Sequence, residues 1–311
     1  MPSTTEQYHK FCAANKISPR SLEVPLPDSD EVVAAHWIGD PDADIVVLYF
    51  HGGGYTQAGT EGYLRYWTRI VDELNSDVKS IAVLQLAYSL APEARYPRQL
   101  QEAAAVLAHL ITSGRGSSDI ILAGDSAGGN LVLGLLSYVL HPHPGLNVLK
   151  IEGRLRGALL ISPWVTFGQD HESFKRNYQT DIMAPRMLRR YAGMYLSRSA
   201  DPEADPGRVQ GGTYTEPLIN EASWWNGLDG VVSCVLVWYG ENEVFADAIA
   251  EFEAIFREGW RKGAAEVDHI VFVRSPGRAH IEPIMGYMLE PGTKGEHQIV
   301  IEEWFRAILS G

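Results

Sequence analysis

The chain has 311 residues, of which 45% are hydrophobic and 21% are charged, and its formal net charge is −13. This composition is typical of a globular protein with a sizeable core and argues against a disordered chain. The acidic balance argues against nucleic acid or an anionic membrane surface as a partner, because both are bound through clustered Lys and Arg side chains, and it suits a neutral or cationic small molecule better.

Short apolar runs recur along the chain and predict six strands. Within each run the apolar residues are nearly continuous rather than alternating with polar ones. Runs of this kind suit strands that are buried on both faces of a parallel sheet. The predicted strands cover residues 45–50, 81–86, 120–123, 157–161, 234–239 and 270–273.

Segments with apolar residues at three-and-four spacing predict helices between most of these strands. The predicted helices cover residues 99–111, 130–140, 244–260 and 297–309. Because strands and helices alternate along the chain, we expect an α/β fold with a mostly parallel, doubly wound sheet.

Residues 167–226 interrupt this alternation. They contain one helical pattern, 184–196, followed by the Pro- and Gly-containing residues 201–207, which predict a loop. An insertion of this length between sheet strands is typical of a cap over a site. We therefore predict a single domain over residues 1–311, with helical cap elements at about 1–30 and 167–226.

Ser126 is the candidate nucleophile, in the sequence Gly124-Asp125-Ser126-Ala127-Gly128. The predicted strand 120–123 runs directly into this motif, and an apolar helix follows it. In this setting a serine sits on a sharp strand-to-helix turn, and flanking glycines avoid collisions with the neighbouring strand and helix. The helix N-terminus behind the serine favours developing negative charge. The competing interpretation is a Gly-Ser turn without chemistry.

Three consecutive glycines, in His51-Gly52-Gly53-Gly54, follow the predicted strand 45–50. Packing does not explain them, whereas the lack of side chains lets backbone N–H groups point into a site. An acyl-transfer intermediate needs such donors about 3 Å from its oxygen. Our candidates for this oxyanion hole are the N–H groups of Gly53, Gly54 and Ala127. A phosphate-binding loop is the competing interpretation, but no Gly-Lys-Ser or Gly-Lys-Thr follows. We interpret His51 as a structural residue that shapes the loop.

On these motifs the sequence resembles the hormone-sensitive-lipase-like family of α/β-hydrolases. That family pairs a His-Gly-Gly-Gly loop with a Gly-Asp-Ser-Ala-Gly-Gly elbow, and both occur here unaltered. Residues 87–97 resemble the family's Tyr-Arg-Leu-Ala-Pro-Glu segment, with Ser89 in place of the usual arginine. The resemblance covers roughly residues 46–309 and implies the α/β-hydrolase fold and a serine esterase with a catalytic triad.

His280 is the candidate general base. In this fold the triad follows the chain order Ser, Asp or Glu, His. The histidines after the insertion are His269, His280 and His297, and His280 lies in a turn just beyond the predicted strand 270–273. His269 precedes that strand and His297 lies near the last helix, so both are more naturally surface residues.

The resemblance places the triad acid at Glu243, in the segment that follows the predicted strand 234–239. The family usually has Asp-Pro-Leu-x-Asp there, so Glu243 replaces an aspartate and Asp247 matches the second aspartate. Triads with glutamate are known chemistry in this fold. Glu241 and Asp247 stay open as alternatives, since either could be a solvated carboxylate at a helix start.

These residues predict a carboxylic-ester hydrolase that forms an acyl-enzyme on Ser126 and needs no cofactor and no metal ion. The expected partner is a small-molecule ester or acyl substrate of small to medium size, and the many cap aromatics favour an aromatic or polycyclic one. Such aromatics are also typical of packing between cap and core. The candidates for the pocket wall are Tyr55, Trp164, Phe167, Tyr214 and Trp224.

Two other functions stay open. The same triad could serve acyl transfer, or a cyclisation or condensation in a biosynthetic pathway. A third hypothesis is a non-catalytic ligand-binding module, since this fold has been reused as a hormone sensor. Such proteins tend to lose the catalytic histidine, which is present here as His280.

Cysteine usage and the N-terminus indicate where the protein works. Cys12 and Cys234 are the only cysteines and lie far apart in sequence, which predicts reduced thiols rather than a disulfide framework. The first residues lack a basic segment followed by an apolar run, and no stretch approaches the roughly 18 apolar residues of a membrane span. We therefore expect a cytoplasmic protein without membrane attachment, in which the last helix could serve a homodimer interface.

Overall fold

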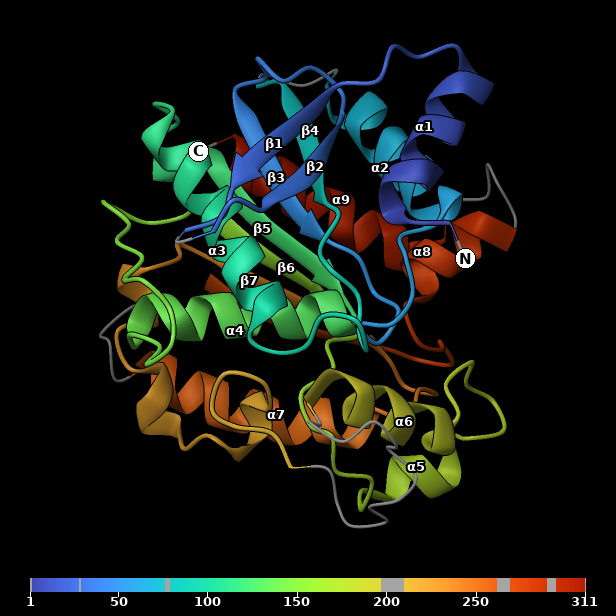
Figure 1. Cartoon of the computed structure of the whole chain (residues 1–311). Helices are drawn as coiled ribbons and strands as arrows, with labels where there is room; N and C mark the ends of the chain where they lie inside the picture. Colours follow the sequence, from blue (N-terminus) through green and yellow to red (C-terminus); the bar gives the residue numbers. More distant parts are fainter. Residues whose placement is uncertain are drawn as a thin grey trace.

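The computed structural model of the chain describes residues 2–27, 29–75, 79–196, 210–261, 269–289 and 295–310. Within these residues one sheet lies between two layers of helices (Figure 1). Its strands are β1 Ser21–Pro25, β2 Val32–Ile38, β3 Ile45–Phe50, β4 Ile81–Leu86, β5 Ile120–Asp125, β6 Gly157–Ile161, β7 Val235–Gly240 and β8 Ile270–Ser275.

The strand order is β1-β2-β4-β3-β5-β6-β7-β8. β2 pairs antiparallel with both β1 and β4, and every pair from β4 to β8 in this order is parallel. The mostly parallel, doubly wound sheet predicted from the sequence is confirmed.

Helices cover both faces of the sheet. The longer ones are α1 Thr4–Asn15, α2 Glu61–Leu74, α3 Arg98–Thr112, α4 Ala127–Leu140, α6 Pro185–Leu196, α7 Ala246–Arg261, α8 Glu282–Leu289 and α9 Glu296–Leu309. The shorter ones are α5 Glu172–Arg176 and the 3₁₀ helices η1 Ser117–Asp119, η2 Pro217–Ile219, η3 Ala222–Trp225 and η4 Leu228–Gly230.

The core is divided by the sheet into two clusters. Successive side chains of a strand point to opposite faces. Thus Val46 and Leu48 of β3 join a cluster with residues of α3, α4 and α7, whereas Ile45 and Val47 join a cluster with residues of α1, α2 and α9. Because both faces are covered, the strands need apolar residues at every position, which explains their continuous apolar runs.

The six predicted strands and the four predicted sheet-flanking helices are all present, with ends within three residues of the predicted ones. The sequence pattern did not predict β1, β2, α1, α2 and α8. β1 and β2 form the antiparallel edge of the sheet, where exposed and buried residues are mixed. They therefore lack the continuous apolar run that marks the other strands.

The two segments predicted as cap elements differ from each other. Residues 21–25, inside the first segment, form the edge strand β1 of the main sheet. The second segment, residues 167–226, is named the cap segment. In it α6, the helix predicted at 184–196, lies beyond the central strands together with α5 (Figure 1). η2 and η3 instead contact α7 and α4. The loop predicted at 201–207 lies outside the described residues.

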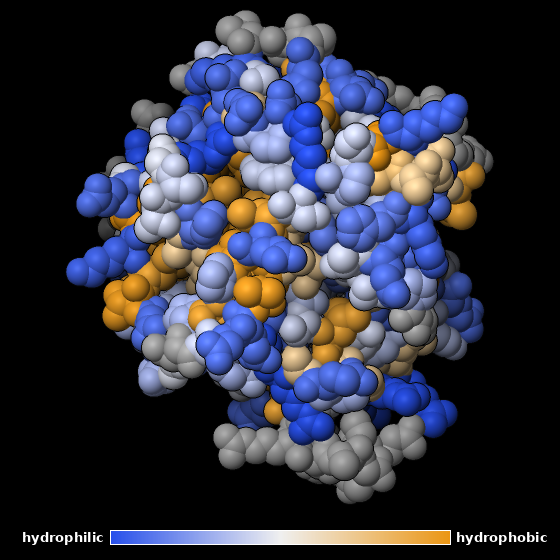
Figure 2. Space-filling model, turned by 45° about the horizontal axis from the view of Figure 1, so that its top comes forward, coloured by the Kyte–Doolittle hydropathy of each residue, from blue (hydrophilic) through white to orange (hydrophobic). Residues whose placement is uncertain are grey.

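One face of the molecule is mostly polar. Figure 2 shows hydrophilic side chains over much of one face, with hydrophobic side chains gathered near its centre. No helix in the described part of the chain combines the length and the apolar character that crossing a membrane requires.

Candidate active site

Ser126 lies at the turn between β5 and α4. Its φ of 52° is left-handed backbone that residues other than glycine rarely adopt. Its N–H donates to the Ile161 carbonyl at 2.9 Å, and its carbonyl accepts from the Trp164 N–H at 3.0 Å, so the end of β6 holds the strained turn. A Cβ atom at Gly128 would lie 1.9 Å from the Phe50 carbonyl oxygen. The glycine is therefore required for α4 to begin so close to β3.

His280 and Glu243 form a hydrogen-bonded chain with Ser126. His280 Nε2 lies 2.9 Å from Ser126 Oγ, and His280 Nδ1 lies 2.8 Å from Glu243 Oε2. Because a carboxylate oxygen accepts, Nδ1 carries the ring proton and Nε2 accepts from the hydroxyl. The three side chains come from loops at the carboxyl ends of β5, β7 and β8, and all are buried. The structure thus brings together the three residues predicted as a triad.

Acidic groups surround the His280 ring. Burial alone disfavours its charged form, but the hydrogen bond and the negative charge of Glu243 outweigh burial, so the pKa of His280 is raised above its usual 6.5. The charges of Asp181 and Asp125 act in the same direction. Burial also raises the pKa of Glu243, against the lowering effect of its bond to His280. The acidic groups around His280 therefore favour protonation of its imidazole ring when a neighbouring group releases a proton.

The alternative acids have other partners. Glu241 pairs with Arg274 at 3.2 Å and is 43% exposed. Asp247 pairs with Arg176 at 2.7 Å. Among the described residues it is Glu243, and neither of these two carboxylates, that is hydrogen-bonded to His280, so the geometry favours Glu243 as its partner.

Of the two alternative histidines, only His269 has a described side chain. His269 is exposed and precedes β8, at the end of the strand opposite to the one that leads to His280. The side chain of His297 lies outside the described part of the chain.

The glycine loop lies beside Ser126. Gly53 and Gly54 have φ values of 103° and 60°, and a Cβ atom at Gly54 would lie 2.3 Å from the ring of Tyr191. Among the described residues, the N–H groups of Gly53, Gly54 and Ala127 donate to no protein acceptor. For Ala127 this follows from its place in the first turn of α4. The three donors are free to bind an oxygen of a substrate, and their role as an oxyanion hole stays a prediction.

Buried side chains fix the start of this loop. His51 Nδ1–H donates to the Gly52 carbonyl at 2.7 Å, and His51 Nε2 accepts from the Thr4 hydroxyl at 3.1 Å. Burial lowers the pKa of His51 to about 4, so the ring is neutral. Asp125 Oδ1 accepts from the Gly52 N–H at 2.9 Å and from the Tyr49 hydroxyl. His51 therefore shapes the loop, and Asp125 is a second anchor of the loop, which the sequence pattern did not predict.

Three of the predicted pocket residues lie close to Ser126. The Tyr55 hydroxyl donates to Asn130 Oδ1 at 2.6 Å, and its ring stacks on Tyr195 at 3.8 Å. Trp164 and Phe167 meet edge to face at 4.8 Å. Each of the three is at most 5% exposed, so packing between the cap segment and the core explains them. Contact with a substrate stays a prediction.

Tyr214 and Trp224 are not brought to the site. The Tyr214 hydroxyl donates to the His141 carbonyl, and Trp224 Nε1 donates to Ser137 Oγ, both at 3.1 Å. These partners lie at the carboxyl end of α4, whose 14 residues extend about 20 Å from Ser126. Their assignment to the pocket wall is therefore corrected: they pack the cap segment onto the far end of α4.

Two further residues of the site were missed by the sequence analysis. The Phe245 ring lies edge to face with His280 at 5.1 Å. Ser162 is fully buried, and its Oγ accepts from the Ile281 N–H at 3.0 Å. Ser162 follows β6 directly, so a polar residue at the carboxyl end of a predicted strand was the signal that could have identified it. No comparable signal marks Phe245.

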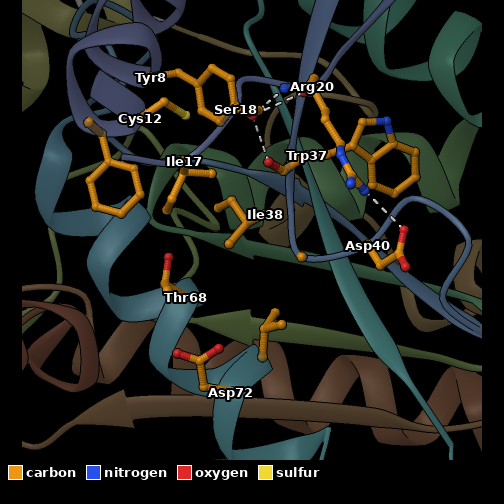
Figure 3. Close-up of a pocket in the computed structure, with 13 residues that line it drawn as sticks. Tyr8, Cys12, Ile17, Ser18, Arg20, Trp37, Ile38, Asp40, Thr68 and Asp72 are labelled. Carbon is orange, nitrogen blue, oxygen red and sulfur yellow. Dashed lines mark hydrogen bonds and ion pairs between the residues drawn. The ribbon is translucent and has the colours of Figure 1, made fainter. Parts of the chain in front are cut away.

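The described residues contain no group of three His, Cys, Asp or Glu side chains that could hold a metal ion. A cavity of about 480 Å³ lies between α1, α2 and the end of β2 (Figure 3). Its lining includes Tyr8, Trp37 and Asp72, and the ion pair between Arg20 and Asp40 lies at one side. None of the predicted catalytic residues lines it.

Sequence comparison finds relatives among ester hydrolases. Steryl acetyl hydrolase 1 of Saccharomyces cerevisiae is 26% identical over 254 residues, which cover 77% of this chain and 52% of that protein. The hormone-sensitive lipase of Homo sapiens is 40% identical over 98 residues, covering 29% of this chain and 8% of that protein. In its alignments with three of the curated relatives, the chain spans about half of their length.

Structural comparison agrees on the fold. A solved esterase from the bacterial hormone-sensitive lipase family matches with a TM-score of 0.66 and 22% identity, covering 99% of this chain and 93% of that one. This likeness shows the α/β-hydrolase fold. Residues 4–293 match the family model described as steryl acetyl hydrolase. The chain therefore belongs to the steryl acetyl hydrolase family, among the hormone-sensitive-lipase-like α/β-hydrolases.

Proposed function

We propose that this protein hydrolyses carboxylic esters through an acyl-enzyme on Ser126. The observation that carries the proposal is the hydrogen-bonded chain from Glu243 through His280 to Ser126, with distances of 2.8 and 2.9 Å. A serine hydroxyl is a weak nucleophile unless an adjacent base removes its proton, and the base needs a third group to orient it. All three roles are filled here by buried side chains.

Each step follows from this arrangement. His280 Nε2 takes the proton of Ser126 as Oγ attacks the ester carbonyl, while Glu243 holds the tautomer and stabilises the imidazolium. The N–H groups of the oxyanion hole stabilise the tetrahedral oxygen. His280 then gives its proton to the leaving alcohol. In the second half, His280 takes a proton from the water that attacks the acyl-enzyme, and returns it to Ser126 Oγ as the acid is released.

An acetyl ester of an apolar, ring-containing alcohol is the substrate class that we propose. The description of the matching family model and the name of the yeast relative support this class. A cavity of about 470 Å³ reaches His280, and its lining combines the apolar side chains of Ile182, Met285 and Leu289 with the charged side chains of Arg278 and Glu282. The apolar part of this lining suits the hydrocarbon part of an ester.

A substrate panel tests this proposal. With p-nitrophenyl esters we expect kcat/KM to be highest for the acetate and to fall for the butyrate and the octanoate. With acetates we expect release of acetate from a sterol acetate to exceed that from ethyl acetate. A maximum at the octanoate would contradict the acetyl assignment. Labelling by a fluorophosphonate without hydrolysis of any of these esters would contradict hydrolysis itself and favour acyl transfer.

The pH dependence of kcat/KM should have an acid limb above pH 6.5. His280 acts as a base only when neutral, and its raised pKa means that it stays protonated, and inactive as a base, to higher pH than an ordinary histidine. Activity should therefore be lost as the pH falls through the raised pKa. The profile with p-nitrophenyl acetate measures this limb, and a limb well below pH 6 would contradict the assignment of His280.

A further inference from the structure

The part of the cap segment that precedes α6 holds the loop that carries Glu243. Ser173 Oγ–H donates to the Val244 carbonyl at 2.6 Å. Asn177 Nδ2–H donates to the carbonyls of Glu241 and Glu243 at 3.0 and 2.9 Å. Both donating residues are at most 4% exposed. The cap segment thus fixes the backbone of the acid loop from outside the sheet.

Asp181, at the end of the same segment, reaches two loops at once. Its Oδ2 accepts from the Val244 N–H at 2.7 Å, and its Oδ1 accepts from the His280 N–H at 3.4 Å. Val244 directly follows Glu243. One carboxylate therefore connects the backbone beside the acid to the backbone of the base, across sequence separations of 63 and 99 residues.

We propose that Asp181 is a positioning residue of the triad, which holds the Glu243 and His280 loops at the spacing that their hydrogen bond requires and favours the positive charge of His280 during proton transfer. This inference rests on the proposed function of the triad. It gives the cap segment a part in the chemistry, because movement of residues 173–181 away from the sheet would release both loops.

Three acidic groups face His280, each from a different element. Glu243 comes from the loop after β7, Asp125 from the end of β5 and Asp181 from the cap segment. Burial has the largest effect on the His280 pKa and lowers it, Glu243 has the largest raising effect, and Asp181 raises the pKa further. The charge of Asp181 also raises the pKa of Glu243. The charge of Asp181 is therefore most favourable when Glu243 is ionised and His280 is protonated, because these two side chains then form an ion pair without net charge.

The variant Asp181→Asn tests the inference, because it has nearly the same shape and removes the charge. An amide has one accepting oxygen, so it can keep the bond to Val244 only by turning its NH₂ group towards the His280 N–H. We expect kcat to fall by roughly 10-fold to 100-fold. We also expect the acid limb of kcat/KM to move to lower pH, since the variant removes a charge that raises the His280 pKa.

Asp170→Asn is the matched control. Asp170 is an exposed carboxylate in the same cap segment, and its removal changes the net charge by the same amount. We expect the control to keep the wild-type kcat and acid limb. If Asp181→Asn folds poorly by thermal unfolding, Asp181→Glu replaces it: that variant keeps the charge, so we expect a lower kcat with the wild-type acid limb.

The outcomes separate this inference from the proposed function. Wild-type protein that hydrolyses esters, together with an Asp181→Asn variant whose kcat and acid limb match those of the control, would contradict the role of Asp181 alone. For Asp181→Asn, which removes the charge, a lower kcat with an unchanged acid limb would also contradict it, because a purely structural contact has that signature. Wild-type protein without labelling by a fluorophosphonate and without hydrolysis would contradict the proposed function instead.

Discussion

Ser126→Ala is expected to lower kcat for ester hydrolysis by about 10⁵-fold or more and to abolish covalent labelling by a fluorophosphonate. The variant removes the atom that forms the acyl-enzyme, and no other nucleophile is hydrogen-bonded to His280 in the described structure. Mass spectrometry of the labelled protein measures the adduct, and p-nitrophenyl acetate measures the turnover.

The same variant should leave the fold intact. Alanine adopts the φ of 52° at this turn with much the same strain as serine, and the change removes one hydrogen bond, worth about 1 kcal/mol of unfolding free energy. Ser118→Ala, at an exposed serine before β5, is the control and should keep both activity and labelling. Full turnover of Ser126→Ala in the presence of normal folding would show that Ser126 is not the nucleophile.

The sequence was sufficient for those parts of the site that are encoded locally. The elbow around Ser126 requires small residues at fixed neighbouring positions, because Gly128 passes the Phe50 carbonyl at a distance that excludes a Cβ atom. In the glycine loop, a Cβ atom at Gly54 is excluded in the same way by the ring of Tyr191. Such constraints act within a few residues, so they leave a readable motif. The position of His280 was also accessible, because it follows a recognisable buried strand.

The parts that depend on distant packing could not be predicted. Nothing next to Asp181 in sequence marks its bonds to Val244 and His280, which form only when the cap segment folds against the ends of β7 and β8. Tyr214 and Trp224 show the opposite error. Their aromatic rings suggested a pocket wall, but an amphipathic ring packs equally well on the end of α4, and sequence alone does not show which end of the helix a cap residue meets.

The choice among Glu243, Glu241 and Asp247 was likewise open in the sequence, and their partners in the structure favour Glu243. Three carboxylates within seven residues all suit a turn that leads into a helix. Burial separates them, since Glu243 is fully buried and bonded to His280 whereas Glu241 and Asp247 pair with surface arginines.

Glu243→Gln is therefore expected to lower kcat by about 10⁴-fold, with substrate binding affected far less. The amide of the variant can present its NH₂ group to His280 Nδ1, which stabilises the tautomer with the proton on Nε2. That proton then faces Ser126 Oγ, and the ring can no longer accept the hydroxyl proton. Loss of the carboxylate also removes the group that raises the His280 pKa most. The residual activity should therefore have its acid limb at lower pH.

Glu241→Gln and Asp247→Asn are the matched controls, because each removes one negative charge from the same segment at a partly exposed ion pair. Exposed pairs of this kind contribute at most about 1 kcal/mol, so both controls should keep kcat within about threefold of the wild type. If Glu241→Gln or Asp247→Asn lost activity while Glu243→Gln kept it, the acid of the triad would be reassigned. If all three kept full activity, His280 would function without a carboxylate partner, and the buried pair at 2.8 Å would have a structural role only.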